Sequence, residues 1–162
     1  IRDRTSVGRA YVDRYGGRFL DLDEAIEGRF GLTIREIFES RGEGAFRAAE
    51  TAELERTTAH SDLVVATGGG LFASSVNRDL IVCSGGVAVF LDPPWEVIRQ
   101  RLGTTDSDRP KWIDEQHARE LFLERRPRYL TAGAHLRLAG DETPQRVAEM
   151  IDICLTEVSC AS

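Results

Sequence analysis

Cysteine is scarce in this chain, and the cysteines that occur are poorly placed for a structural role. The sequence has three of them, Cys83, Cys154 and Cys160, an odd number with no CxxC spacing. This pattern argues against a disulfide framework and against a zinc site, and it favours a reducing compartment. We therefore expect a cytoplasmic location.

Long apolar runs, a signal-peptide pattern and an excess of positive charge are also lacking. No apolar stretch is long enough to span a bilayer, so we expect no membrane partner. The formal net charge is −6, which does not favour binding to nucleic acid. The remaining expectation is a globular protein that acts on small molecules.

Apolar runs of strand length alternate with helical patterns along the whole chain. This alternation predicts an α/β fold with a parallel sheet that helices cover on both faces. The 162 residues fit one domain, and no repeat or linker divides them. We therefore predict a single domain over residues 1–162.

The run at residues 63–67 reads as a fully buried strand, and it ends abruptly in three glycines. Glycines let a ligand approach the backbone closely, and ligands of open α/β sheets bind beyond the carboxyl ends of strands. Gly68, Gly69 and Gly70 are therefore candidates for the floor of a ligand site. A glycine-rich turn without a ligand is the alternative.

Two carboxylates follow the short apolar run at residues 19–20. Alternation along an extended backbone places Asp21 and Asp23 on the same side. One suits a cation or its water, and the other could hold or deprotonate a hydroxyl. The structural alternative is that Asp23 caps the next helix while Asp21 is merely solvated.

Arginines form the third candidate feature. Arg47 and Glu50 lie three residues apart on a predicted helix, either as a surface ion pair or as a guanidinium held to grip an anion. A cluster of basic residues between positions 99 and 128 suits phosphate clamping by a loop and its flanking helices. Its members are Arg99, Arg101, Arg109, Lys111, Arg119, Arg125, Arg126 and Arg128. Pro127 is expected to end the helix before it.

Several motifs in order resemble those of the shikimate kinase family. Residues 19–27 (FLDLDEAIE) resemble its FxDxDxxIE segment, and residues 31–38 (GLTIREIF) its GxSIxEIF run. Residues 42–50 (GEGAFRAAE) resemble GExxFRxxE, residues 68–70 the GGG loop, residues 109–110 the lid RP, and residues 125–129 (RRPRY) the RxPxY motif. The resemblance is collinear from about Thr5 to Met150.

The resemblance implies a P-loop kinase fold of the nucleoside-monophosphate-kinase type, with three layers. It implies transfer of phosphate from ATP to the 3-hydroxyl of shikimate, with Mg²⁺, in aromatic amino-acid biosynthesis. The partners would be shikimate and ATP, and the chain would be a monomer. The lid would span about residues 103–118.

The resemblance also carries roles over to positions of this chain. Asp23 would bind the ring hydroxyls and act as base, Arg47 and Arg125 would hold the carboxylate, and Gly68, Gly69 and Gly70 would contact the ring. Asp21 and Thr5 would serve the magnesium ion. The nucleotide would be met by Arg4, Thr5, Ser6, Arg101 and Arg109, the last of which would also be catalytic from the lid.

The start of the chain departs from the family. The family begins with a buried strand and a G-x-x-x-x-G-K-[ST] loop. Here Asp3 and Arg4 align with the last loop glycine and the lysine, and the expected first strand and loop are missing or degenerate. Either this is a truncated copy of a working kinase, which the non-Met start favours, or it is an inactive binding or regulatory module. A kinase of another hydroxy acid, such as gluconate, is a third possibility, against which Asp23, Arg47 and Arg125 argue.

Overall fold

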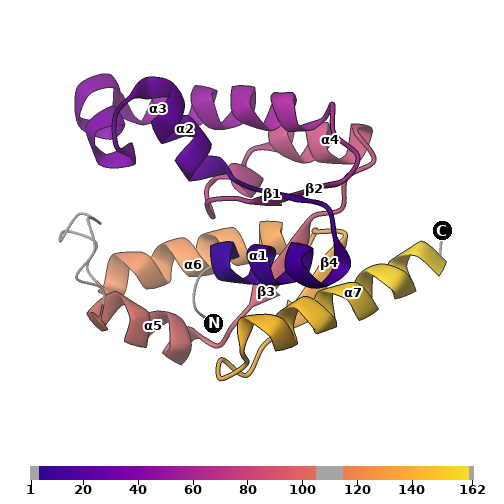
Figure 1. The fold of residues 1–162 in the computed structure, drawn as a ribbon. Helices are drawn as coiled ribbons and strands as arrows, with labels where there is room; N and C mark the ends of the chain where they lie inside the picture. The colour runs from indigo at the N-terminus through magenta and orange to yellow at the C-terminus, as the bar shows by residue number, and fades with distance from the viewer. Residues whose placement is uncertain (1–3, 105–114, 161–162) are drawn as a thin grey trace. The chain divides into compact units, whose positions relative to one another are not determined.

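The computed structural model describes residues 4–104 and 115–160 (Figure 1). It divides into two compact units, one up to Gly86 and one from Val87 onward, and each is described by itself. Helices and parallel strands alternate in both, which confirms the predicted α/β class. The single domain over residues 1–162 stays a prediction.

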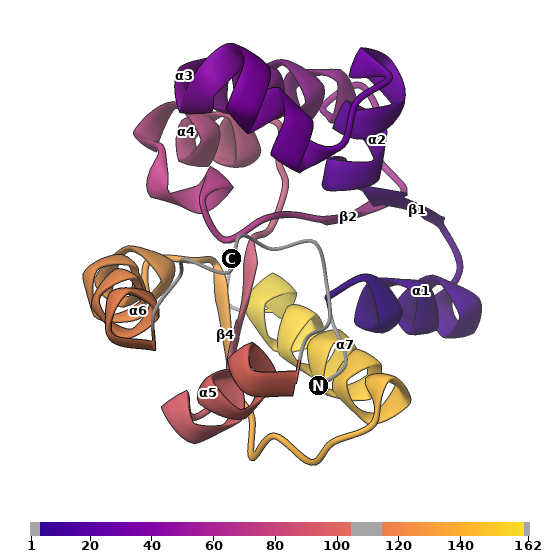
Figure 2. The ribbon, with the colours of Figure 1, turned by 90° about the vertical axis from the view of Figure 1, so that its left-hand side faces the viewer.

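The first unit contains five elements of regular helix or strand before its glycine loop and two short helical elements after it. In chain order they are α1 (Arg4–Tyr15), β1 (Arg18–Asp21), α2 (Leu22–Phe30), α3 (Ile34–Thr57), β2 (Leu63–Ala66), the 3₁₀ turn η1 (Leu71–Ala73) and α4 (Ser75–Cys83). Figures 1 and 2 show α1 on one face of the β1–β2 pair and α3 with α4 on the other. Helices thus cover both faces of this small sheet.

Strands β1 and β2 run parallel, with Asp21 opposite Ala66 at their carboxyl ends. The expectation of a fully buried β2 is wrong, because only Ala66 is buried and the three residues before it are half-buried. Among the described residues β2 pairs with β1 alone, so one of its edges has no neighbouring strand to shield it. Its carboxyl end nevertheless meets the glycine loop, as predicted.

Local signals explain where the helices of this unit begin and break. Thr33 and Glu36 form a complete capping box at the start of α3, and the two hydrogen bonds from Thr33 lower the pKa of Glu36. Gly42 lies inside α3 with φ 79° and ψ 169°, so the helix is broken at this glycine. Gly31 ends α2 in the left-handed conformation that glycine favours.

The residue that caps the helix after β1 differs from the one that the sequence suggested. The N-cap of α2 is Asp21, whose side chain accepts hydrogen bonds from the amides of Asp23 and Glu24. Asp23 therefore lies in the first turn, and Asp21 is buried rather than solvated. The expectation that Asp21 and Asp23 share one side of an extended backbone is wrong, because the strand ends at Asp21 and both Leu22 and Asp23 already belong to the helix.

An apolar core holds the helices of the first unit together. Its fully buried members come from α2, α3 and η1, and they are Leu22, Ile26, Ile37, Phe46, Leu54 and Leu71. On the opposite face, α1 approaches β1 so closely that a Cβ at Gly8 would lie 2.9 Å from Cδ2 of Phe19. Packing on both faces of the sheet thus holds the carboxyl ends of β1 and β2 in place. The candidate site is built from these ends.

The second unit repeats the pattern of parallel strands and helices. It contains β3 (Val89–Asp92), α5 (Trp95–Thr104), α6 (Glu115–Tyr129), β4 (Ala134–Arg137) and α7 (Pro144–Cys160). Asp92 at the end of β3 lies opposite Arg137 in the parallel β3–β4 register. The amide of Arg146 donates to Thr143 Oγ1, so Thr143 caps the start of α7.

Pro127 does not end α6 as predicted. It lies inside the last turn, and the amide of Leu130 still donates to the carbonyl of Arg126 beyond it. The proline removes the hydrogen bond that an amide at this position would donate to the carbonyl of Leu123, and only two residues of the helix follow it. No helix among the described residues is long and apolar enough to cross a membrane.

Candidate active site

Asp21 is the buried centre of the candidate site in the first unit. It is 7% exposed. Its Oδ1 accepts from the amides of Asp23 at 3.0 Å and Glu24 at 3.4 Å, and its Oδ2 accepts from Thr5 Oγ1 at 2.5 Å. One carboxylate therefore ties the first turn of α1 to the first turn of α2.

Asp23 projects from the first turn of α2 and forms an ion pair with Arg4, the first residue of α1. Both side chains are about one-third exposed, so the pair is accessible to a ligand. The sequence suggested Arg4 as a phosphate contact and Asp23 as a base, but it gave no indication that the two touch. Because the two residues lie 19 positions apart, no helical or strand periodicity in the sequence indicates their contact.

The glycine loop after β2 brings the remaining acceptor-side residues together. A Cβ on Gly68 would lie 3.6 Å from Asp23 Oδ1 and 3.4 Å from Glu50 Oε1, which are ordinary contacts. A Cβ on Gly70 would overlap the Arg47 guanidinium, with Cζ only 2.6 Å away. The loop thus lies between a carboxylate on α2 and a guanidinium on α3, and position 70 has no room for a side chain.

Arg47 is held by two glutamates of its own helix. Nη1 donates to Glu50 Oε2 at 2.6 Å, while Nε and Nη2 donate to Glu43 Oε1 at 3.2 and 3.0 Å. Burial alone would lower the pKa of Arg47, but the hydrogen bonds and charges of Glu50 and Glu43 outweigh it and raise that pKa. Glu50 is 1% exposed, so the predicted Arg47–Glu50 pair is a buried anchor rather than a surface bridge.

The other predicted residues lie elsewhere or outside the described part. Ser6 is half-buried on α1, Gly69 is exposed, and Arg125 is half-buried on α6 in the second unit. Arg101 belongs to α5, but its side chain lies outside the described residues, as does all of Arg109 and most of the predicted lid.

A polar cluster in the second unit was missed by the sequence interpretation. Buried Asp92 accepts from Arg126 Nη2 at 2.7 Å and Nε at 3.3 Å and contacts His135 Nε2 at 2.9 Å. Burial alone would raise the pKa of Asp92, but Arg126 and His135 outweigh it and hold this pKa below its usual range. A carboxylate directly after a strand was the available signal. Arg126 therefore has a structural role in this cluster, whereas its neighbour Arg125 is not part of it.

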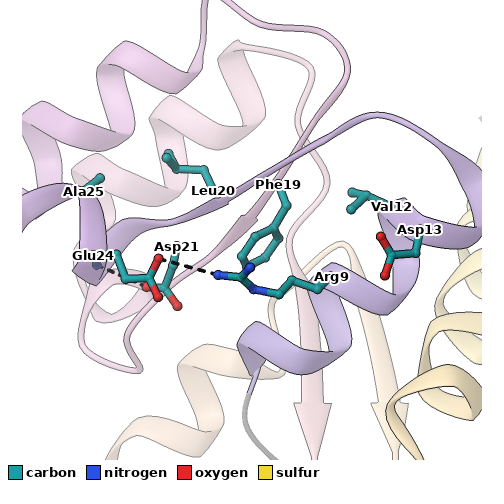
Figure 3. Close-up of a pocket in the computed structure, with 8 residues that line it drawn as sticks. All are labelled: Arg9, Val12, Asp13, Phe19, Leu20, Asp21, Glu24 and Ala25. Carbon is teal, nitrogen blue, oxygen red and sulfur yellow. Dashed lines mark hydrogen bonds and ion pairs between the residues drawn. The ribbon is translucent and has the colours of Figure 1, made fainter.

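A cavity of about 570 Å³ opens beside the buried centre, between α1, β1 and α2 (Figure 3). Asp21 forms part of its wall, and two other lining residues, Arg9 and Glu24, form an ion pair at 3.7 Å. The remaining lining residues are Val12, Asp13, Phe19, Leu20 and Ala25. Asp23 and Arg47 do not line it, so it is separate from the space between the carboxylate and the guanidinium.

The chemistry of the first unit suits a small hydroxylated acid. A carboxylate accepts hydrogen bonds from hydroxyls, and an arginine fork binds a carboxylate in a bidentate way. Here Asp23 and Arg47 lie on either side of a loop without side chains, which lets a ligand approach the backbone closely.

Known proteins share both the sequence and the fold. The family model described as shikimate kinase matches residues 4–155. A shikimate kinase of Acinetobacter baylyi is 38% identical over 151 residues, which cover 91% of this chain and 83% of that protein. One from Sulfurihydrogenibium is 34% identical over 149 residues, covering 91% and 88%.

Solved structures agree. Shikimate kinase from Aquifex aeolicus matches with a TM-score of 0.83 at 30% identity, over 98% of this chain and 92% of that one. Shikimate kinase from Acinetobacter baumannii in complex with shikimate matches with a TM-score of 0.83 at 35% identity, over 94% and 86%. Sequence and fold thus lead to one conclusion: this chain belongs to the shikimate kinase family.

Proposed function

We propose that the protein transfers the γ-phosphoryl group of ATP to the 3-hydroxyl of shikimate. The observation that carries the proposal is the placing of Asp23 and the Arg47–Glu50 pair around the glycine loop of residues 68–70. The ligand must then present hydroxyls to one side and a carboxylate to the other, which shikimate does.

Asp23 is the proposed base. Its carboxylate orients the 3-hydroxyl and accepts its proton as the oxygen attacks the γ-phosphorus. The new bond joins that oxygen to phosphorus, the bond from phosphorus to the β–γ bridging oxygen breaks, and ADP leaves. Arg47 fixes the other end of the ring through the carboxylate, with Arg125 as its proposed partner. Holding both ends places the hydroxyl for in-line attack, which supplies most of the rate in phosphoryl transfer.

The residues near Asp21 fit a magnesium ion bound through nucleotide. Mg²⁺ prefers hard oxygen ligands and is often held by one or two protein groups together with phosphates and water. Asp21 and the Thr5 hydroxyl, 2.5 Å apart, are such a donor set. The ion would neutralise charge on the phosphates of ATP. Arg4, Ser6, Arg101 and Arg109 are the proposed nucleotide contacts.

An inactive shikimate-binding module is the second candidate, and the Arg4–Asp23 ion pair favours it. Where the family motif has a lysine for phosphate, this chain has an arginine whose charge is directed at the proposed base. The acceptor side of the site would then bind shikimate without turnover.

The test combines two measurements on the same chain. Shikimate-dependent release of ADP is measured with ATP and Mg²⁺ against a control without shikimate, and shikimate binding is measured by calorimetry. Turnover with binding supports the kinase. A second outcome is that the chain binds shikimate without turnover and gains turnover when a strand and a glycine-rich loop are added before residue 1. That outcome also supports the kinase site. Binding that stays without turnover in the extended chain supports the module. Absence of binding in both chains contradicts both.

Two further features of the protein are inferred along with this function. The residues proposed for the site all belong to one chain, and we infer a monomer. All three cysteines are unpaired, which suits the cytoplasm.

A further inference from the structure

Glu43 occupies a particular place on the Arg47 guanidinium. One of its oxygens accepts from both Nε and Nη2, which together form one edge of the arginine fork. Arginine has five N–H donors, and this edge is one of the two that a carboxylate can take in a bidentate way. Nη1, on the other side, donates to buried Glu50.

The two glutamates differ sharply in how firmly they are held. Glu50 is 1% exposed, whereas the side chain of Glu43 is 65% exposed. An exposed ion pair of this kind contributes little and is easily exchanged, while removing a buried partner is costly. Glu50 is therefore the fixed anchor of Arg47, and Glu43 is the displaceable contact.

The backbone beside Glu43 reinforces this difference. Glu43 directly follows Gly42, whose φ of 79° interrupts α3. Residues 42–44 are exposed, and a Cβ at Gly42 would meet nothing within 4 Å. Phe46, on the same turn, is held in the core, so the Glu43 side chain can change its rotamer while the turn keeps its core contacts.

We propose that Glu43 fills the carboxylate position on Arg47 when no substrate is bound, and that shikimate binds by displacing it. This rests on the proposed function, because it deepens the role given there to Arg47. One carboxylate replaces another on the same edge of the guanidinium, so the charge around Arg47 stays balanced in both states. Glu43 then sets the affinity for acids by competition, and it keeps the site from binding weak anions.

The test is calorimetric titration with shikimate of wild type and three variants. Glu43→Gln removes the competing charge, and we expect the dissociation constant to fall roughly two- to fivefold, the range expected for an exposed ion pair. Glu43→Asp keeps the charge but shortens its reach, so it should tighten binding in the same direction. If only long-range repulsion mattered, Glu43→Asp would behave as wild type, and the displacement proposal would be wrong.

The matched control is Glu39→Gln. Glu39 makes the same type of i,i+4 pair on α3, with Arg35 at 2.8 Å and similar exposure, but not with Arg47. We expect unchanged shikimate affinity. Weaker binding in Glu43→Gln would mean that Glu43 orients Arg47, which overturns the proposal.

The same titrations distinguish failure of the proposed function from failure of the displacement proposal. If neither wild type nor Glu43→Gln binds shikimate, the acceptor assignment itself falls and the displacement proposal falls with it. If only Glu43→Gln binds, competition is supported in its strongest form. If wild type binds and Glu43→Gln matches it, the function stands and the displacement proposal alone is refuted.

Discussion

Gly70 lies against the Arg47 guanidinium with no space for a side chain. Gly70→Ala should displace Arg47 and weaken shikimate binding at least roughly tenfold, the loss of one charge-assisted hydrogen bond. Calorimetry measures the affinity, and urea unfolding checks the fold. Gly28→Ala is the control, because a Cβ there meets nothing within 4 Å and helix propensity should make it slightly stabilising. Unchanged affinity in Gly70→Ala would remove Arg47 from the site.

Arg125 and Arg126 are neighbours with opposite expected roles. Arg125→Ala should weaken shikimate binding by about 2–5 kcal/mol, the cost of leaving a bound carboxylate without its partner. Arg126→Ala should instead lower the free energy of unfolding by about 1–3 kcal/mol, because buried Asp92 loses two hydrogen bonds. Calorimetry and urea unfolding of both variants separate the two effects. Equal affinity of Arg125→Ala and wild type would contradict the carboxylate role.

At the scale of elements, Asp92 joins β3 to α6 and β4 through Arg126 and His135. Its pKa is lowered in the folded protein, so its contribution to stability is present above the ordinary value of 3.8 and is lost as pH falls through the lower folded value. Asp92→Asn should therefore be less stable than wild type at pH 7, and the gap should narrow below about pH 3.8. Urea unfolding across pH measures this. A gap independent of pH would contradict it.

The same elements show what the sequence can predict. The short apolar runs at residues 19–20 and 63–67 identified β1 and β2, because such signals are local. Asp21 was misassigned because both aspartates fit a cap and the backbone decides between them. The pairs Arg4–Asp23 and Arg126–Asp92 were missed because they join residues 19 and 34 positions apart, which no periodicity reveals. Local patterns made the glycine loop, the two aspartates and Arg47 candidates, while the roles proposed for them come from the family resemblance.

For the whole molecule, the prediction of one domain can be tested through unfolding. Both tryptophans, Trp95 and Trp112, follow Gly86 and report on the second unit, whereas far-UV circular dichroism reports on helices of both units. If the chain is one cooperative domain, urea transitions from the two signals should coincide in midpoint and steepness. Separate midpoints would instead identify two independently unfolding units.

The bonding of Asp21 has a consequence for how the two substrates influence each other. The same carboxylate receives the Thr5 hydroxyl, proposed for nucleotide and metal, and the amide of Asp23, proposed for the acceptor. When nucleotide and its metal ion bind beside Thr5, the electrostatic potential at the first turn of α2 changes. Saturation with one substrate should then shift the dissociation constant of the other, and by thermodynamic reciprocity the factor is the same in both directions. A single buried aspartate would thus couple the binding of the two substrates instead of leaving the two events independent.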